Sequence, residues 1–200
     1  MSVTVNARVA DMGRWQPDSR GRLQEAALAL YSERGFDQTT AAQIADRAGL
    51  TERTFFRHFA DKREVLFGGS ALLQKEIVAG VAGAPATDRP LEAVSRGLHA
   101  AAVMLGESRR DLTRQRQAVI TANPELRERE LAKLAEYGAS VAATLRQRGV
   151  GEPQATLAAD SGMTVLRVAI QRWASSEDGR ELTDVMRDAV AQLRAVTGRG

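Results

Sequence analysis

Residues 40–62 read Thr40-Ala-Ala-Gln-Ile-Ala-Asp-Arg-Ala-Gly-Leu-Thr-Glu-Arg-Thr-Phe-Phe-Arg-His-Phe-Ala-Asp-Lys62, and they contain the start signals of two short helices joined by a glycine turn. The Thr40 hydroxyl can cap the first helix, and Gln43 can reach back to the Thr40 amide, which makes a capping box. Gly49 is the residue type that adopts the left-handed conformation at the end of a helix. Thr51 can cap a second helix directly after the turn. The segment therefore predicts a helix-turn-helix.

The second helix of this pair has a buried side and an outward side. Phe55 and Phe59 lie four residues apart on one helical face, so both rings should point into a core. The opposite side carries Arg53, Thr54 and Arg57. Arginine can bind a guanine edge or a phosphate with two hydrogen bonds, and a threonine methyl group can contact thymine. This pattern is typical of a helix that lies in the major groove of DNA.

Capped helix pairs with solvated charges also occur in other all-helical proteins, so the surrounding residues matter. The segment from about Arg20 to Phe67 resembles the N-terminal domain of the TetR family of bacterial transcriptional regulators. The matching pieces share one register and are Ala26 to Phe36 (AALALYSERGF), Thr39-Thr40, Ile44-Ala45, Ala48-Gly49-Leu50, Thr54 to Phe59 (TFFRHF), Lys62 and Leu66. The length of this match distinguishes it from a bare two-helix pattern.

The resemblance implies a set of DNA contacts. In the family, the first threonine of the motif contacts a phosphate, the second helix lies in the major groove, and a lysine at the start of the next helix holds the DNA backbone. At the matching positions of this sequence, the set is Thr40, Thr51, Arg53, Thr54, Phe56, Arg57, His58 and Lys62.

Two residues of this set leave alternatives open. Phe56 stands where the family usually has a tyrosine whose hydroxyl reaches a phosphate, so Phe56 keeps the ring contact without that hydrogen bond. His58 lies beside two phenylalanines that are expected to be buried, and it either contacts DNA or packs into the core.

The composition predicts an all-α protein that is cytoplasmic and makes no membrane contact. Hydrophobic residues make up 44% of the 200 residues and aromatic residues only 4%, and no alternating strand pattern extends beyond a few residues. We find neither an apolar run of ~18 residues nor the apolar core of a signal peptide. The chain has no cysteine, which fits a reducing compartment and excludes thiol catalysis and cysteine metal sites.

The net charge of the chain is compatible with DNA binding but does not by itself indicate it. The net charge is +3, and residues 1–67 contain ten Lys and Arg against nine Asp and Glu. Any DNA affinity must therefore come from the placement of individual side chains rather than from bulk charge.

The sequence predicts about nine helices in three regions. Residues 1–19 look like a mobile tail, residues 20–67 form the three-helix DNA-binding domain, and residues 68–200 form a larger helical domain for ligand binding and dimerisation. A helix is expected from Asp61 to about Val81, although it contains Gly68-Gly69, and a linker follows at residues 83–90. Further helices are expected at residues 91–107, 109–121, 124–148, 153–174 and 180–196.

The last two predicted helices, at residues 153–174 and 180–196, are candidates for a homodimer contact. The second carries an apolar seam, and the first carries small residues that would let another backbone come close. The seam comprises Leu182, Val185, Met186, Ala189, Leu193 and Val196, and the small residues are Ala155, Ala158, Ala159 and Gly162. An intramolecular core is the alternative, and periodicity does not separate the two. The resemblance favours the dimer, which a palindromic operator also requires.

The resemblance further implies a repressor that a small molecule releases from double-stranded DNA, with no cofactor. An apolar pocket lining suggests a hydrophobic or amphipathic ligand, although core packing also explains each candidate residue. The candidates are His99, Met104, Ile120, Met163, Leu166, Ile170 and Trp173.

Two other classes of function have weaker support from the residues. An enzyme is disfavoured because His58 and His99 are the only histidines and no metal-ligand, phosphate-loop or nucleophile-elbow spacing occurs. A helical adaptor protein would use the C-terminal seam but would leave the Arg53 and Arg57 side of the motif unexplained.

Overall fold

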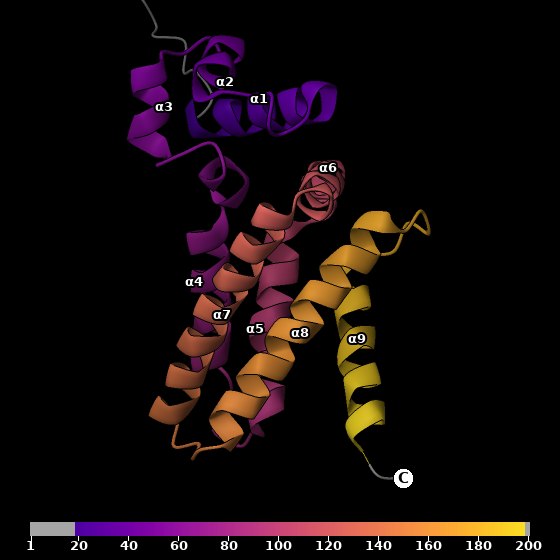
Figure 1. Cartoon of the computed structure of the whole chain (residues 1–200). Helices are drawn as coiled ribbons and strands as arrows, with labels where there is room; N and C mark the ends of the chain where they lie inside the picture. Colours follow the sequence, from indigo (N-terminus) through magenta and orange to yellow (C-terminus); the bar gives the residue numbers. More distant parts are fainter. Residues whose placement is uncertain (1–18, 199–200) are drawn as a thin grey trace, which may run out of the picture.

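The computed structural model describes residues 19–198, and all regular secondary structure in that range is helical (Figure 1). The helices are α1 (Ser19–Arg34), α2 (Ala41–Arg47), α3 (Glu52–His58), α4 (Ser70–Ala82), α5 (Pro90–Leu105), α6 (Arg110–Ala122), α7 (Pro124–Gln147), α8 (Gln154–Ser175) and α9 (Leu182–Thr197), with two short 3₁₀ helices, η1 (Glu64–Phe67) and η2 (Glu107–Arg109). The prediction of an all-α fold is confirmed. The predicted tail lies, apart from Ser19, outside the described residues.

Two clusters of buried apolar side chains hold these helices together. The N-terminal core joins α1, α2, α3 and η1 to the end of α6 and the first turn of α7 through Val119, Ile120 and Leu126. The C-terminal core joins α4, α5, α7, α8 and α9. In Figure 1, α1, α2 and α3 lie together at one end of the molecule, and α4, α5, α7 and α8 run away from them. From the larger region, α6 packs against α1, and the first turn of α7 adds Leu126 to the same core.

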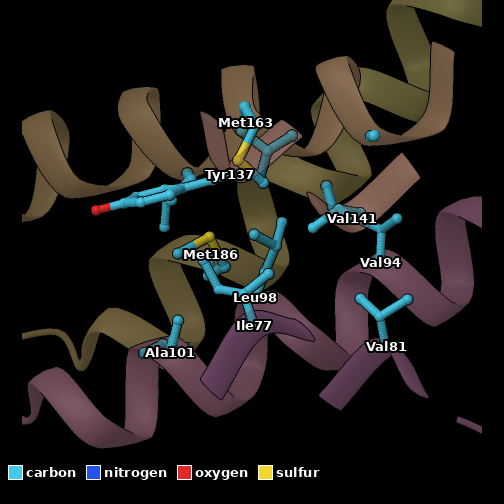
Figure 2. Packing of buried hydrophobic residues seen from close by; sticks show 14 of the residues in the cluster. Ile77, Val81, Val94, Leu98, Ala101, Tyr137, Val141, Met163 and Met186 are labelled. Atoms are coloured by element: carbon cyan, nitrogen blue, oxygen red, sulfur yellow. The ribbon is translucent and has the colours of Figure 1, made fainter. Parts of the chain in front are cut away.

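The α5 helix lies in the middle of the C-terminal core, where it packs against α4, α8 and α9. Figure 2 shows Val94 and Leu98 of α5 beside Ile77 and Val81 of α4. These two helices approach so closely that a Cβ atom at Gly97 would lie 2.5 Å from the Ile77 carbonyl oxygen. Glycine at this position allows direct contact between the two backbones.

The predicted single helix from Asp61 to about Val81 is wrong. The chain forms η1 and a two-glycine break, and only then does α4 begin. A Cβ atom at Gly68 would lie 2.9 Å from the Phe59 ring and 2.7 Å from the Gln24 side chain. The helix is interrupted because the chain passes directly over α1 and the end of α3, where there is no room for a side chain.

One described segment, Glu64–Ala82, is long and apolar enough to cross a membrane by length and composition alone, with a mean hydropathy of 1.3. It consists of η1, the glycine break and α4, and α4 packs against α5 and α7. The expectation that no such run occurs needs this correction. The packing of α4 accounts for part of the apolar character.

Most of the apolar seam predicted for the last helix packs inside the subunit, whereas Val196 at its end is 85% exposed. Leu182, Val185 and Met186 of α9 are buried in the C-terminal core, and α9 lies against α5 and α8. Ala155 and Ala159 of α8 are buried in the same core. These residues pack within the subunit, as the intramolecular alternative has it, so a dimer contact through α8 and α9 would have to use other faces of the two helices.

Replacing Gly97 by alanine should destabilise the protein by about 1–3 kcal/mol, because the added methyl group overlaps the α4 backbone. Urea unfolding followed by circular dichroism measures this change. Gly151→Ala is the matched control, because no atom lies within 4 Å of the Cβ position there. The free energy of unfolding of this control should stay the same or rise slightly. Equal stability of the two variants would contradict the close approach of α4 and α5.

Candidate nucleic-acid interface and internal cavity

The helix-turn-helix is capped as the sequence predicts. Thr40 Oγ1 accepts a hydrogen bond from the Gln43 amide at 3.2 Å, and Gln43 Oε1 accepts one from the Thr40 amide at 3.0 Å. Gly49 has a φ of +65° between the helices. Thr51 Oγ1 accepts a hydrogen bond from the Thr54 amide at 3.2 Å. These local bonds fix where α2 ends and α3 begins.

The outward side of α3 is open to solvent. Arg53 and Arg57 are exposed, and neither guanidinium has a hydrogen-bond or ion-pair partner among residues 19–198. The Phe56 side chain is 53% exposed, and its ring lies edge-on to the buried Phe55 ring at 5.3 Å. Thr54 is half-buried beside them. The two arginines are therefore available to bind an anion or a base edge.

His58 lies on the other side of α3. It is half-buried, its ring centroid lies 6.3 Å from that of the buried Phe59, and it lines a cleft between the end of α3 and the start of α7. Its Nε2 atom is buried and has no hydrogen-bond partner in the described part of the chain. This position favours the packing alternative for His58 over a DNA contact.

Lys62 is engaged within the protein. Its ammonium donates to the carbonyl oxygens of Phe36 at 2.8 Å, Thr39 at 3.0 Å and Asp37 at 3.3 Å, and it lies 4.3 Å from the centroid of the Phe36 ring. An ammonium has three N–H donors, so these carbonyls occupy all of them. This arrangement gives Lys62 a structural role in holding the α1–α2 loop against the segment after α3, and the phosphate contact of Lys62 stays a prediction.

Tyr31 and Asp61 support the same junction. The Tyr31 hydroxyl donates to the Lys62 carbonyl oxygen at 2.6 Å. Burial raises the pKa of Tyr31, and the charge of Asp61 raises it further, so the hydroxyl stays protonated. Burial would also raise the pKa of Asp61, but hydrogen bonds from the Arg63 side chain and from the Glu64 and Arg63 amides lower that pKa below its usual value. The stabilisation by ionised Asp61 is therefore present at neutral pH and is lost as the pH falls through the lowered pKa.

A cavity of about 180 Å³ lies between the N-terminal core and helices α4 to α8. Three of the predicted ligand residues line it, and they are Met104, Leu166 and Ile170. Further apolar side chains come from several elements that the sequence analysis did not connect, and they are Leu28, Val65, Leu66, Phe67, Leu72, Leu73, Leu105, Leu112 and Leu134. The cavity thus borders both apolar cores.

The other four predicted ligand residues lie elsewhere. His99 is exposed in a groove between α5 and α9. Ile120 is buried in the N-terminal core and Met163 in the C-terminal core. Trp173 is fully buried beneath Arg110, whose guanidinium lies 5.5 Å from the centroid of the indole ring. Helical periodicity identified these last three as interior residues, but it does not reveal which interior side chains border an opening.

The polar wall of the cavity was missed by sequence reasoning. Arg116 donates from Nε to the Leu66 carbonyl oxygen at 2.7 Å and from Nη1 to Glu130 Oε1 at 3.1 Å. Its guanidinium also lies 5.1 Å from the centroid of the Phe67 ring. Gln117 donates to the same Glu130 oxygen at 3.2 Å, and its own Oε1 is buried without a partner in residues 19–198. In the sequence, these residues belong to polar stretches that resemble ordinary solvent-facing helix surfaces.

Comparison with known proteins places this arrangement in a family. The model for bacterial regulatory proteins of the tetR family matches residues 23–67, and the model for the MftR C-terminal domain matches residues 88–198, which is more than half of the chain. The chain belongs to the TetR family. The predicted resemblance over residues 20–67 is confirmed, and the match extends to the C-terminal region.

Curated relatives of this TetR-family chain are transcriptional regulators. TcmR of Streptomyces glaucescens is 36% identical over 120 residues, which are 60% of this chain and 52% of TcmR. The repressor KstR2 of Mycobacterium tuberculosis is 45% identical over 47 residues, which are 24% of each chain. The chain thus matches about half of TcmR and a quarter of KstR2. MftR of M. tuberculosis is 23% identical over 169 residues, 83% of this chain and 85% of MftR.

Solved structures show the same fold. The TetR-family regulator PfmR of Thermus thermophilus is 25% identical with a TM-score of 0.51, over 89% of this chain and 100% of PfmR. The complex of SmeT with triclosan is 19% identical with a TM-score of 0.62, over 89% and 90% of the two chains. The T. thermophilus repressor FadR with lauroyl-CoA is 24% identical with a TM-score of 0.51, over 90% and 96%.

Replacing Lys62 by methionine should lower the stability of this TetR-family chain by about 1.5–3 kcal/mol, because it removes charged hydrogen bonds to three carbonyl oxygens. Thermal and urea unfolding measure the change. Arg53→Met is the control, since its exposed side chain has no partner in residues 19–198 and its loss should leave stability nearly unchanged. If the Lys62→Met variant is as stable as wild type, the structural role assigned to Lys62 is contradicted.

Proposed function

We propose that the chain is a dimeric transcriptional repressor that binds a palindromic operator through α3 of each subunit. The observation that carries this proposal is the exposed pair Arg53 and Arg57 on a capped second helix whose Phe55 side is buried. A helix presented in this way fits the major groove, where arginine can bind guanine. Thr40 and Thr51 cap the two helices of the motif, and the first turns of such helices can contact phosphate oxygens.

Release of the operator by a small molecule completes the proposal. Regulators of the TetR family bind DNA and small-molecule effectors and act as dimers. The SmeT structure contains triclosan and the FadR structure contains lauroyl-CoA. In this chain, the cavity that borders both apolar cores is the candidate effector site, since a molecule that enlarges it would push on η1 and α6 together.

The two other classes of function have less support. The relatives named above as regulators agree with the prediction that the chain is not an enzyme. An adaptor without a DNA site would leave the exposed arginines of α3 without a role. The proposed function also requires that the protein is located in the cytoplasm, together with the operator.

Replacing Arg57 by alanine should weaken binding to the operator by about 1–3 kcal/mol if its guanidinium binds a guanine edge. Genome-wide footprinting of the tagged protein in its host supplies the operator, and fluorescence anisotropy then measures affinity for it and for a scrambled duplex. The loss should be larger for the operator than for the scrambled DNA. Arg127→Ala, an exposed arginine on α7, is the control and should bind both duplexes as wild type does. Unchanged operator affinity of Arg57→Ala would remove this residue from the interface.

A dimer contact through the outer face of α8 is supported by exposed apolar side chains. Leu157 is 62% exposed and Val168 is 40% exposed. Together with Ser161 and Thr164 they are spaced by four, three and four residues, so they form one stripe along the helix. Such a stripe faces water in the single subunit and would be covered by the same stripe of a second copy.

Replacing Val168 by aspartate should therefore convert the dimer to monomers, because burial of two symmetry-related carboxylates against each other is unfavourable. Sedimentation velocity measures the oligomeric state. Leu131→Asp is the matched control, because Leu131 is 58% exposed but lies on α7. If Leu131→Asp gives monomers and Val168→Asp stays dimeric, the interface lies on α7 instead.

A further inference from the structure

The wall of the cavity carries more positive than negative charge. Its charged side chains are the cations of Arg109, Arg116, Lys133 and Arg167 and the carboxylate of Glu130. Lys133 also pairs with Glu136 at 3.2 Å. Within residues 19–198, the side chains of Arg109 and Arg167 have no ion-pair or hydrogen-bond partner. A pocket with this balance attracts anions and repels cations.

Arg116 has unused hydrogen-bond donors at this wall. A guanidinium has five N–H groups, and only two of those of Arg116 have a protein acceptor in the described structure: Nε bonds to Leu66 and Nη1 to Glu130. The side chain is 26% exposed and borders the cavity. Its Nη2 group can therefore donate to a further anionic partner, and a guanidinium binds carboxylates and phosphates with the best geometry of any side chain.

Most of the remaining wall is apolar, and the volume of the cavity limits the size of the ligand. Its volume of about 180 Å³ slightly exceeds the ~150 Å³ of an apolar cavity that accepts benzene. It is smaller than the ~300–1,000 Å³ of most ligand pockets. A one-ring body fits the cavity as it stands, and a larger body has to move the walls.

We propose that the effector is an amphipathic acid whose apolar body fills the cavity and whose anionic group binds Arg116, and that Arg116 passes this event to the DNA-binding domain. That ligand binding releases the operator rests on the proposed function, whereas the preference of the cavity for an acid does not. The same guanidinium that faces the cavity holds the Leu66 carbonyl oxygen and packs on the Phe67 ring. An anion bound at Nη2 that draws this guanidinium further into the cavity weakens both contacts.

The end of η1, which Arg116 contacts, can move separately from the start of η1. Leu66 and Phe67 end η1, and Gly68 and Gly69 follow without side chains. The start of η1 is held separately, because Glu64 pairs with Arg129 of α7 at 2.6 Å. When Arg116 turns toward an anion, the end of η1 loses its tie to α6, while its start stays attached to α7 and the Gly68 carbonyl oxygen stays bonded to Arg20 Nη2 at 2.5 Å. Because η1 connects α3 to α4, this motion changes how the DNA-binding domain sits on α4.

The experiment uses three probes that share one apolar ring, which fits the cavity as it stands: benzoate, benzyl alcohol and benzylamine. Isothermal titration calorimetry with the full chain measures their affinities. The carboxylate should bind about tenfold or more tightly than the alcohol, as expected for one charge-assisted hydrogen-bond pair, and the amine should bind most weakly. Equal or tighter binding of the alcohol or the amine, or no binding of the carboxylate, would overturn the proposal.

Variants test which side chain causes the preference for the carboxylate over the alcohol. Arg116→Gln should abolish the advantage of the carboxylate over the alcohol. Glu130→Gln should increase carboxylate affinity several-fold because it removes the competing anion, and a gain of affinity is not explained by misfolding. Arg109→Gln is the control, since it removes the same charge from the rim of the cavity without touching η1. An equal loss of preference in Arg109→Gln and Arg116→Gln would show that the overall positive charge of the wall attracts the carboxylate, and it would contradict the specific role of Arg116.

Hydrogen exchange in the absence of DNA measures whether ligand binding at Arg116 changes the η1 segment. Benzoate should speed exchange of the amides of residues 66–69 in wild type and not in Arg116→Gln. Unchanged exchange in wild type with bound carboxylate would overturn the coupling through Arg116. If the chain proves not to bind an operator while the probe preference and this exchange change are observed, the proposed function fails and the inference about Arg116 stands.

Discussion

The contact of α6 with η1 is the constraint that orders the rest of the molecule. Arg116 binds the Leu66 carbonyl oxygen and the Phe67 ring, while the backbone at Gly68 passes so near Phe59 that no side chain fits. The η1 segment is therefore clamped between the N-terminal core on one side and the cavity on the other. Because α3 and α4 both leave from this clamp, its position sets how the helix-turn-helix is held over the C-terminal core.

The helix-turn-helix itself is held by hydrogen bonds from outside the motif. Lys62 ties the α1–α2 loop to the segment after α3, and Tyr31 binds the Lys62 carbonyl oxygen from α1. Arg47 and Glu33 join α2 to α1 through two hydrogen bonds of 3.0 and 2.7 Å. These ties leave the outward side of α3 unoccupied, and the protein can present its arginines without using them for its own stability.

The C-terminal core combines large buried side chains such as Trp173 and Leu98 with close backbone approach at glycines. Gly97 lets α5 touch α4, and a Cβ atom at Gly162 of α8 would meet a Val94 methyl group at 2.3 Å. Buried alanines on α5 and α8 continue this pattern. Since most of the apolar seam of α9 is also used within the subunit, the dimer surface that we propose is a separate stripe on α8.

Local chemistry explains why the helix-turn-helix could be predicted from sequence. Caps at Thr40 and Thr51, the turn at Gly49 and the inward spacing of Phe55 and Phe59 act over four residues or fewer, and all were found as predicted. The roles of Lys62 and Arg116 could not be predicted, because their partners lie 23 to 26 and 50 positions away in the chain. Such pairings arise only when helices pack, and packing also settles which interior side chains border a cavity.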